Sequence, residues 1–289
     1  MFPVLFRIGS FEITSFGLMM FLSFLGGAWI LSKWLKRYGF NPDLAWDMLA
    51  WIAIGGILGA KLYYLGLHWR DLVADPIGEL TSRAGLVWYG GMMGGLTAYY
   101  LQIRSRKLPA AVMFDALAPA VAVAYAIGRL GCFLVGDDYG MSTNAWYGIA
   151  FPKGVPPTYA GNLRSLGDNI PASIPNDAVV AVHPTQLYEI GLSLVIFAIL
   201  WRLARKQLRP GRLFAAWMAM YSVERFFIEF VRAKSDRLAF GLTTSQIMSV
   251  LALVVAIVLW LRQRETPVWS PAAVPPGAGI KPRAAKSAA

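Results

Sequence analysis

The chain has 289 residues, of which 57% are hydrophobic and only 15% are charged, and its mean hydropathy is +0.51. A soluble globular protein carries about 25% charged residues, so this chain has too few to cover a surface that faces water. The composition therefore excludes a soluble domain and predicts an integral membrane protein. One cysteine excludes a disulfide framework, and two histidines with one cysteine are too few to build a zinc site.

Apolar stretches long enough to cross a bilayer recur along the chain. About 20 apolar residues span the hydrocarbon core, and the candidate segments are residues 16–35, 45–66, 85–103, 110–135, 184–204, 212–232 and 242–262. Residues 1–13 carry one cation and no small-residue cleavage site, so we expect no cleavable signal peptide. We predict an all-α polytopic membrane protein with about seven transmembrane helices.

Lys and Arg residues gather in every second loop. Sixteen of the 27 lie in residues 33–37, 104–107, 202–212 and 262–286. Cytoplasmic loops are enriched in Lys and Arg, which predicts an outer N-terminus and a cytoplasmic C-terminus. The formal net charge of +11 then mainly reflects topology, and it gives no support to a nucleic-acid partner.

Two segments differ from the spans in composition. Residues 137–182 are rich in Gly, Pro and aromatic residues, which predicts a small outward-facing head between spans four and five, with short strands around AWYGIAF and AVVAVHP. The head would be an insertion in a transmembrane catalytic domain of residues 1–262. Residues 263–289 are rich in Pro and Ala without periodicity, which predicts a disordered cytoplasmic tail.

Glycines four residues apart occur in two of the spans. They lie in GGILG (55–59) and in GGMMGG (90–95). Small residues at this spacing let helix backbones approach closely within a bilayer. We therefore predict close helix packing at these two segments.

Ionisable side chains lie inside the fourth and sixth spans. Arg129 interrupts the fourth, and Tyr221, Arg225, Glu229 and Arg232 recur at i, i+4, i+8 and i+11 in the sixth, on one helix face. A charge at mid-bilayer costs about 2.5–3.5 kcal/mol on insertion scales. Salt bridges within the bundle are one explanation, above all for Glu229 and Arg232. Arginines on two different helices favour a second: a site for a phospholipid phosphate, which guanidinium groups bind bidentately.

Further polar residues begin the fifth span and end the second. His183, Gln186 and Glu189 share a face at i, i+3 and i+6, with Tyr188 beside them, although a histidine before proline is also common at a helix start. Lys61 ends the second span. We expect Cys132 to be a small packing residue, with a covalent nucleophile as the alternative.

Four stretches, in chain order, resemble the bacterial prolipoprotein diacylglyceryl transferases: GRLGCFLVGDDYG (128–140), HPTQLYE (183–189), YSVERFFIEFVRAKSD (221–236) and GLTTSQIMSV (241–250). The resemblance implies transfer of the diacylglyceryl group of phosphatidylglycerol to the lipobox cysteine thiol of a prolipoprotein signal peptide, with release of glycerol 1-phosphate. This is the first step of lipoprotein maturation in the bacterial inner membrane. The resemblance also implies no metal or organic cofactor, and a nucleophile that belongs to the substrate.

The resemblance assigns roles to individual residues. The family's two essential arginines correspond to Arg129 and Arg225, its signature glycine to Gly140 and a tyrosine to Tyr221. Asp137 is expected to steer Arg129. We expect Arg129, Arg225, Tyr89, Tyr221 and His183 to be catalytic. We expect the substrate to be bound by Arg129, Asp137, Gly140, Gln186, Tyr188, Glu189, Arg232, Lys61 and Tyr64.

The sequence departs from the family pattern at several positions: Phe16 stands for Tyr, Lys61 for Arg, Tyr89 for His, Cys132 for Asn and Asp137 for Glu. The His replaced by Tyr89 is the favoured general base of the family. An ordinary tyrosine has a pKa near 10 and is a poor base at neutral pH, so we predict an orienting role for Tyr89.

Two other functions are alternatives: an inactive relative that binds lipid or preprotein, and a secondary transporter. A third is an intramembrane serine protease, but this sequence contains no GxSxG motif for the nucleophilic serine.

Overall fold

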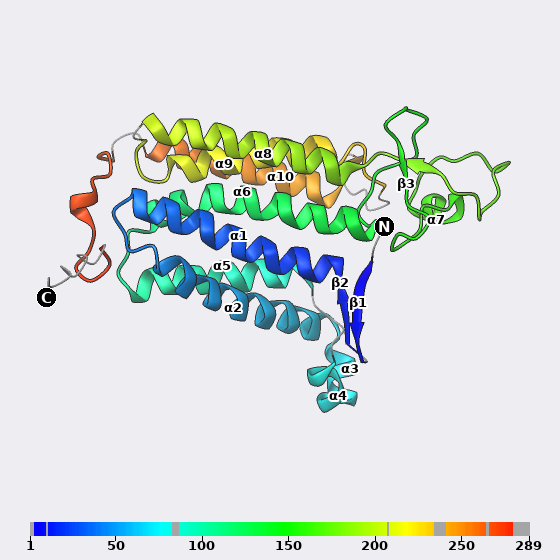
Figure 1. The fold of residues 1–289 in the computed structure, drawn as a ribbon, viewed down its shortest axis with the longest axis horizontal. Helices are drawn as coiled ribbons and strands as arrows, with labels where there is room; N and C mark the ends of the chain where they lie inside the picture. The colour runs from blue at the N-terminus through cyan, green and yellow to red at the C-terminus, as the bar shows by residue number, and fades with distance from the viewer. Residues whose placement is uncertain are drawn as a thin grey trace, which may run out of the picture. The chain divides into compact units, whose positions relative to one another are not determined.

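The computed structural model describes residues 3–9, 11–82, 87–206, 208–233, 241–263 and 266–279, and it is mostly helical (Figure 1). Long helices in these ranges coincide with the predicted spans: α1 (Ser15–Arg37), α2 (Leu44–Leu67), α5 (Trp88–Ser105), α6 (Ala110–Val135), α8 (Thr185–Leu203), α9 (Arg212–Ile228) and α10 (Thr244–Arg262). The start of the predicted span 85–103 lies partly outside the described residues.

Five of the described helices are long and apolar enough to cross a membrane: α1, α2, α6, α8 with the short 3₁₀ turn η1 (Ala204–Lys206) that follows it, and α10. The helix α9 has only 17 residues and α5 has 18. As regular helices, both are shorter than the roughly 20 residues that a perpendicular span needs. Five membrane-crossing helices are therefore supported, and seven spans remain a prediction.

The chain divides into two compact units. The first unit comprises residues 1–30 and 117–268, and the second comprises residues 31–116 and 269–289. The helices α1 and α6 each contribute one end to each unit.

In the second unit, α2 and α5 pack through glycine. A Cβ on Gly59 would lie 2.4 Å from the carbonyl oxygen of Gly90, and one on Gly94 would lie 2.1 Å from that of Gly55. No side chain fits at such distances, so the close packing predicted from the glycine spacing is confirmed. Two short helices that the sequence did not predict, α3 (Trp69–Ala74) and α4 (Pro76–Thr81), follow α2.

Part of the C-terminal segment makes defined contacts in the second unit. The ring of Trp269 stacks on Phe40 at 5.7 Å between centroids, and its Nε1 donates to the carbonyl of Tyr38 at 3.0 Å. Gly39 has a φ of +89°, which turns the chain beneath the short helix η3 (Pro271–Ala273). The composition favours disorder here, yet residues 266–279 are described. Residues 280–289 lie outside the described residues.

In the first unit, the helix α6 is held by neighbours on two sides. A Cβ on Gly131 of α6 would lie 2.9 Å from the Cβ of Met19 in α1, and Ser193 of α8 donates to the carbonyl of Ala122 in α6 at 2.8 Å. The helices α9 and α10 pack on each other, and α8 packs on α9. An unpredicted hairpin of β1 (Val4–Ile8) and β2 (Phe11–Thr14) precedes α1.

The segment between α6 and α8 folds around its own apolar core. The strands β3 (Ile149–Ala150) and β4 (Ala181–Val182) pair antiparallel, at the two stretches where short strands were predicted, and α7 (Ala160–Ser165) lies between them in sequence. Its buried core consists of Tyr139, Phe151, Ala160, Leu163, Ile170, Val182 and Ala233. Because Ala233 follows α9, this head fixes the end of α9 against the end of α6, where the polar residues of the fourth and sixth spans lie.

Candidate functional site

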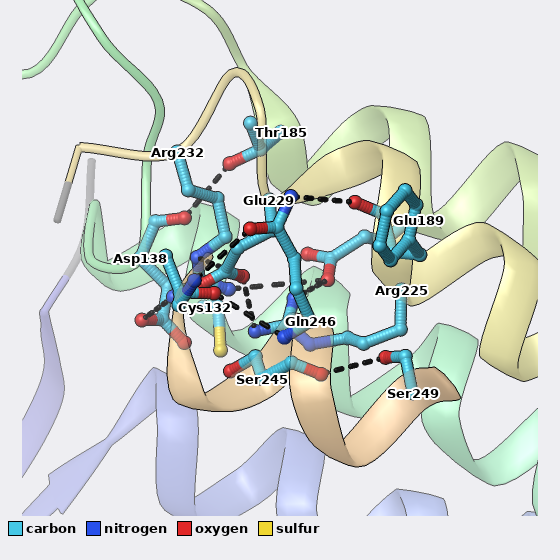
Figure 2. A network of polar contacts seen from close by, with 12 residues as sticks. Cys132, Asp138, Thr185, Glu189, Arg225, Glu229, Arg232, Ser245, Gln246 and Ser249 are labelled. Carbon is cyan, nitrogen blue, oxygen red and sulfur yellow. Dashed lines mark hydrogen bonds and ion pairs between the residues drawn. The ribbon is translucent and has the colours of Figure 1, made fainter. Parts of the chain in front are cut away.

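A buried carboxylate lies at the centre of a polar network in the first unit (Figure 2). Glu189, in the second turn of α8, is 1% exposed, and its Oε2 lies 3.0 Å from Nε of Arg129. Its Oε1 lies 3.1 Å from Nη1 of Arg225 and 3.9 Å from Nη1 of Arg232. One residue of α8 thus gathers Arg129 of α6 with Arg225 and Arg232 of the sixth predicted span.

Two more carboxylates hold the same arginines from other directions. Glu229 follows Arg225 by one helical turn, and its Oε2 lies 2.9 Å from Nη2 of Arg225 and 3.9 Å from Nε of Arg232. Asp138 places Oδ2 2.8 Å from Nη1 of Arg129 and Oδ1 beside Nη2 of Arg232. All three arginines contact carboxylates. In this structure the charges inside the fourth and sixth predicted spans are therefore paired in salt bridges, the first of the two explanations given for them.

Tyr125 completes the network and was not among the predicted residues. Its hydroxyl donates to Oε1 of Glu189 at 2.8 Å and accepts from Nε of Arg129 at 3.1 Å. The predicted Tyr221 lies beside it, with its ring edge-on at 5.3 Å between centroids. Tyr125 precedes Arg129 by four residues and so shares its helix face, a spacing that could have identified it.

The turn after α6 places Asp138 against the arginines. Gly136 and Asp138 have φ angles of +76° and +56°, and this left-handed turn reverses the chain. Thr185 donates its hydroxyl to the carbonyl of Asp138 at 2.8 Å, and Gln186 donates its amide to the carbonyl of Asp137 at 2.5 Å. The start of α8 therefore fixes the turn, so Gln186 acts through the backbone of the turn.

Gly140 is required by close backbone approach. A Cβ at this position would lie 2.5 Å from the carbonyl oxygen of Val231 and 2.8 Å from Cβ of His183. Its N–H donates to the carbonyl of His183 at 2.9 Å, and the next N–H donates to Val231 at 2.8 Å. Gly140 therefore joins the segments that carry His183 and Arg232, which gives the signature glycine a steric role.

The two aspartates of the turn differ in electrostatics. Burial would raise the pKa of Asp138, but attraction to Arg232 and Arg129 outweighs burial and lowers that pKa from 3.8 to about 2. Burial raises the pKa of Asp137, and the charge of Asp138 raises it further. Asp138, and not the predicted Asp137, is the carboxylate that pairs with Arg129.

One group of side chains could bring three ligand atoms together for a metal ion. The ligand atoms of Cys132, Asp137 and Asp138 lie within 4.8 Å of one another. Both oxygens of Asp138 already face guanidinium groups, which repel a cation. Cys132 is buried, and Nη1 of Arg129 lies 3.7 Å from its sulfur. We therefore interpret this group as part of the arginine network.

Glu224 is a buried acid that sequence reasoning did not assign to the site. It is 7% exposed, and neither carboxyl oxygen has a hydrogen-bond partner among the described residues. The charged groups that act on it are Glu189, Arg129 and Arg225. A buried carboxyl without a partner is unusual and marks Glu224 as part of the site's surroundings.

The remaining predicted residues make other contacts. Nδ1 of His183 lies 3.2 Å from the hydroxyl of Tyr188, and both rings face Tyr147 at 6.0 and 6.5 Å. Lys61 donates to the carbonyl of Ser82 at 2.9 Å and lies 5.4 Å from the ring centroid of Tyr64. Tyr64 stacks on His68, and Tyr89 is 45% exposed. Lys61, Tyr64 and Tyr89 belong to the second unit.

Comparison with known proteins points to one family. A family model described as prolipoprotein diacylglyceryl transferase matches residues 3–262. Proteins named phosphatidylglycerol–prolipoprotein diacylglyceryl transferase are similar along most of the chain. The one from Clostridium tetani is 32% identical over 256 residues, which is 88% of this chain and 95% of its own.

Two further relatives with the same name agree. The Xanthomonas oryzae pv. oryzae protein is 31% identical over 300 residues, or 96% of each chain, and the Enterococcus faecalis protein is 30% identical over 270 residues, or 91% of each. These matches extend across both units, so they are not confined to one motif. The chain therefore belongs to the prolipoprotein diacylglyceryl transferase family.

Proposed function

We propose that this transferase moves the diacylglyceryl group of phosphatidylglycerol to the lipobox cysteine of a prolipoprotein, and that it does so at the network around Glu189. The observation that carries the proposal is the convergence of Arg129, Arg225 and Arg232 on one buried carboxylate. Guanidinium groups keep their charge and donate in pairs, which suits a phosphate that has to be bound inside a membrane.

The transfer reaction requires stabilisation of its leaving group, glycerol 1-phosphate. The substrate sulfur attacks the sp³ glycerol carbon and an S–C bond forms, while the C–O bond to phosphate breaks and glycerol 1-phosphate leaves with its electron pair. The thiol proton passes to water or to the departing phosphate. Negative charge grows on the bridging oxygen in the transition state. Fixed cations aimed at that oxygen stabilise the transition state more than the ground state, and losing one such donor costs about 10²–10³ in rate.

The carboxylates give the arginines a fixed geometry. Glu189 and Glu229 are 1% and 0% exposed, and each contacts more than one guanidinium. Because the arginines are already oriented, little reorganisation is needed when a phosphate arrives. Tyr125 adds to this order through its bonds to Glu189 and Arg129.

The thiol needs little help from the enzyme. A free cysteine with a pKa near 8.5 is already a few per cent thiolate at pH 7. We propose that Tyr221 and His183 orient glycerol or phosphate oxygens, and an orienting role for Tyr89, which belongs to the second unit, stays a prediction. We also propose that Gly140, Gln186, Asp137 and Tyr188 shape the turn beside the arginines, and that Lys61 and Tyr64 contact lipid from the second unit.

We propose a topology of seven spans in the bacterial inner membrane, with the N-terminus and the head outside and the tail of residues 263–289 in the cytoplasm. The alternation of Lys and Arg between loops supports it. An outer head places the site on the side where secreted preproteins emerge. A cysteine introduced at position 286 should react with a membrane-impermeant maleimide only in opened cells, and labelling in intact cells would contradict this topology.

Reconstitution tests the proposed function. The purified protein in vesicles that contain phosphatidylglycerol should convert a lipobox peptide to its thioether and release equimolar glycerol 1-phosphate. Vesicles of phosphatidylcholine and a peptide with Ser in place of the lipobox cysteine are the controls. Binding of lipid and peptide without product would instead identify an inactive relative, and movement of lipid without product would identify a transporter.

A further inference from the structure

One carboxylate of the network differs from the other two in exposure. The side chain of Asp138 is 44% exposed, whereas those of Glu189 and Glu229 are 1% and 0% exposed. Asp138 also offers one oxygen to each of two arginines, Oδ2 to Arg129 and Oδ1 to Arg232, as Figure 2 shows for Arg232. It therefore bridges two guanidinium groups from the accessible side of the network.

The backbone beneath this carboxylate is held in place. Asp138 has a left-handed φ of +56°, its carbonyl accepts from Thr185, and Gly140 two residues later is locked against Val231 and His183. The turn therefore cannot move away easily, but the side chain has a single Cα–Cβ bond about which it can rotate into water. Glu189 and Glu229 have no such exit, because both are buried.

A carboxylate and a phosphodiester present the same pattern to two guanidinium groups. Each offers two oxygens that share a negative charge on one central atom, and the N–H groups of arginine donate to both in paired geometry. Among the groups that form ion pairs in the network, three arginines face three carboxylates, those of Asp138, Glu189 and Glu229. Adding a phosphate to all three carboxylates would leave an uncompensated negative charge in a low-dielectric site.

If the phosphate replaces the carboxylate of Asp138, the site gains no extra negative charge. We propose that Asp138 occupies the place of the phosphate before lipid binds, and that the two non-bridging oxygens of a phosphate replace its two oxygens between Arg129 and Arg232. The proposal rests on the proposed function, since it takes the arginines to be the phosphate site. Asp138 then carries its charge into water, and it returns when the product phosphate leaves.

This exchange makes Asp138 an internal competitor for anions. It keeps Arg129 and Arg232 aligned between turnovers, it lowers the affinity for any phosphate, and it helps to expel glycerol 1-phosphate. Asp177, an exposed aspartate of the head for which no ion pair with these arginines is present among the described residues, provides a control.

Binding measurements on the full-length protein test the exchange without relying on turnover. The thermal midpoint of purified wild type, Asp138→Asn and Asp177→Asn is followed against inorganic phosphate and against glycerol 1-phosphate, and in nanodiscs with and without phosphatidylglycerol. If Asp138 occupies the clamp about nine-tenths of the time, its removal should tighten phosphate binding about tenfold, while Asp177→Asn should change it by less than about twofold. Equal or weaker binding in Asp138→Asn would overturn the proposal.

A second measurement uses wild type alone and remains informative if Asp138→Asn does not fold. A water-soluble carbodiimide labels accessible carboxylates, and mass spectrometry reads Asp138 with Asp177 as the internal reference. Labelling of Asp138 relative to Asp177 should rise with glycerol 1-phosphate, with phosphatidylglycerol, or with both, which also identifies the source of the phosphate. Unchanged labelling of Asp138 with every phosphate compound would contradict the exchange of Asp138 for phosphate. If labelling of Asp138 rises but the protein transfers no diacylglyceryl group, only the proposed function is contradicted.

Discussion

At the scale of single residues, the site depends on how many atoms of each guanidinium are engaged. Arg225 places Nη1 on Glu189 and Nη2 on Glu229, and Arg129 places Nε on Glu189 and Nη1 on Asp138. Each arginine thus uses two separate nitrogens in two directions. A lysine offers one nitrogen and cannot reproduce this geometry.

We therefore expect Arg129→Lys and Arg225→Lys to lose activity along with the alanine variants. Each should lower the transfer rate by about 10²–10³, the usual effect of one lost oxyanion donor. Arg7→Lys is the matched control, because Arg7 forms an exposed pair with Glu12 in the hairpin. The test compares the initial transfer rates of these variants, each corrected for the amount of the variant protein in the membrane. Near-normal turnover in both lysine variants would exclude the paired geometry.

The acid–base behaviour of Asp138 gives a second prediction. Because its pKa falls from 3.8 unfolded to about 2 folded, its contribution to stability is fully present above pH 4 and is lost as the pH falls toward 2. Wild type should lose more of its thermal midpoint between pH 4 and pH 2 than Asp138→Asn, which has no charge to lose. Parallel curves for the two proteins would show that the ion pairs of Asp138 do not stabilise the fold.

Glu224 leads to a prediction of the opposite sign. A buried carboxyl without a partner destabilises a fold, because its desolvation is not compensated. Glu224→Gln and Glu224→Leu should therefore keep or raise the thermal midpoint, by an amount equivalent to about 1 kcal/mol. Glu229→Gln is the contrast: it removes a paired carboxylate and should lower stability. A large loss in both Glu224 variants would reveal a partner that the described residues do not provide.

The contacts of these side chains were only partly predictable. The periodicity of the sixth span placed Tyr221, Arg225, Glu229 and Arg232 on one face, since helical spacing is a local property. That Glu189 joins Arg129 to Arg225 depends on how α8 packs against α6 and α9, which no local pattern contains. The pairing of Asp138 depends on a left-handed turn that a non-glycine residue rarely adopts.

At the scale of elements, hydropathy predicted the long helices and spacing predicted the glycine contact. The short strands β3 and β4 also lay where β-branched and aromatic runs suggested them. The hairpin β1–β2 and the helices α3 and α4 were missed, because such short elements have too few residues to show a period. The contact of α2 with α5 allows the sharpest test at this scale.

Gly94→Ala should destabilise the protein, whereas Gly66→Ala should not. The new Cβ at position 94 would meet the carbonyl of Gly55 at 2.1 Å, while nothing lies within 4 Å at position 66. Forcing the backbones apart costs about 1–3 kcal/mol, and an alanine in an open helical position stabilises by up to about 1 kcal/mol. Thermal midpoints of the two variants should therefore move in opposite directions, and equal shifts would contradict the glycine contact.

At the scale of the whole molecule, the composition of residues 263–289 indicated a disordered tail, yet residues 269–279 are described and belong to the second unit. Composition alone cannot detect such a contact, because Pro-rich and Ala-rich residues show no period. The residues that make it are an aromatic pair more than two hundred positions apart, Phe40 and Trp269. Phe40 is fully buried, so the C-terminal segment covers apolar surface at the turn between α1 and α2.

We expect Trp269→Ala to weaken the whole molecule without affecting the chemistry. The substitution removes the stacked ring and the hydrogen bond from Nε1 to the carbonyl of Tyr38. An aromatic pair contributes about 0.5–1.5 kcal/mol beyond its burial, and a net hydrogen bond about 0.5–1.5 kcal/mol, so the thermal midpoint should fall by several degrees. Trp146→Ala is the matched control, because that ring is 94% exposed. A Trp269→Ala protein as stable as Trp146→Ala would mean that the C-terminal segment does not hold the turn.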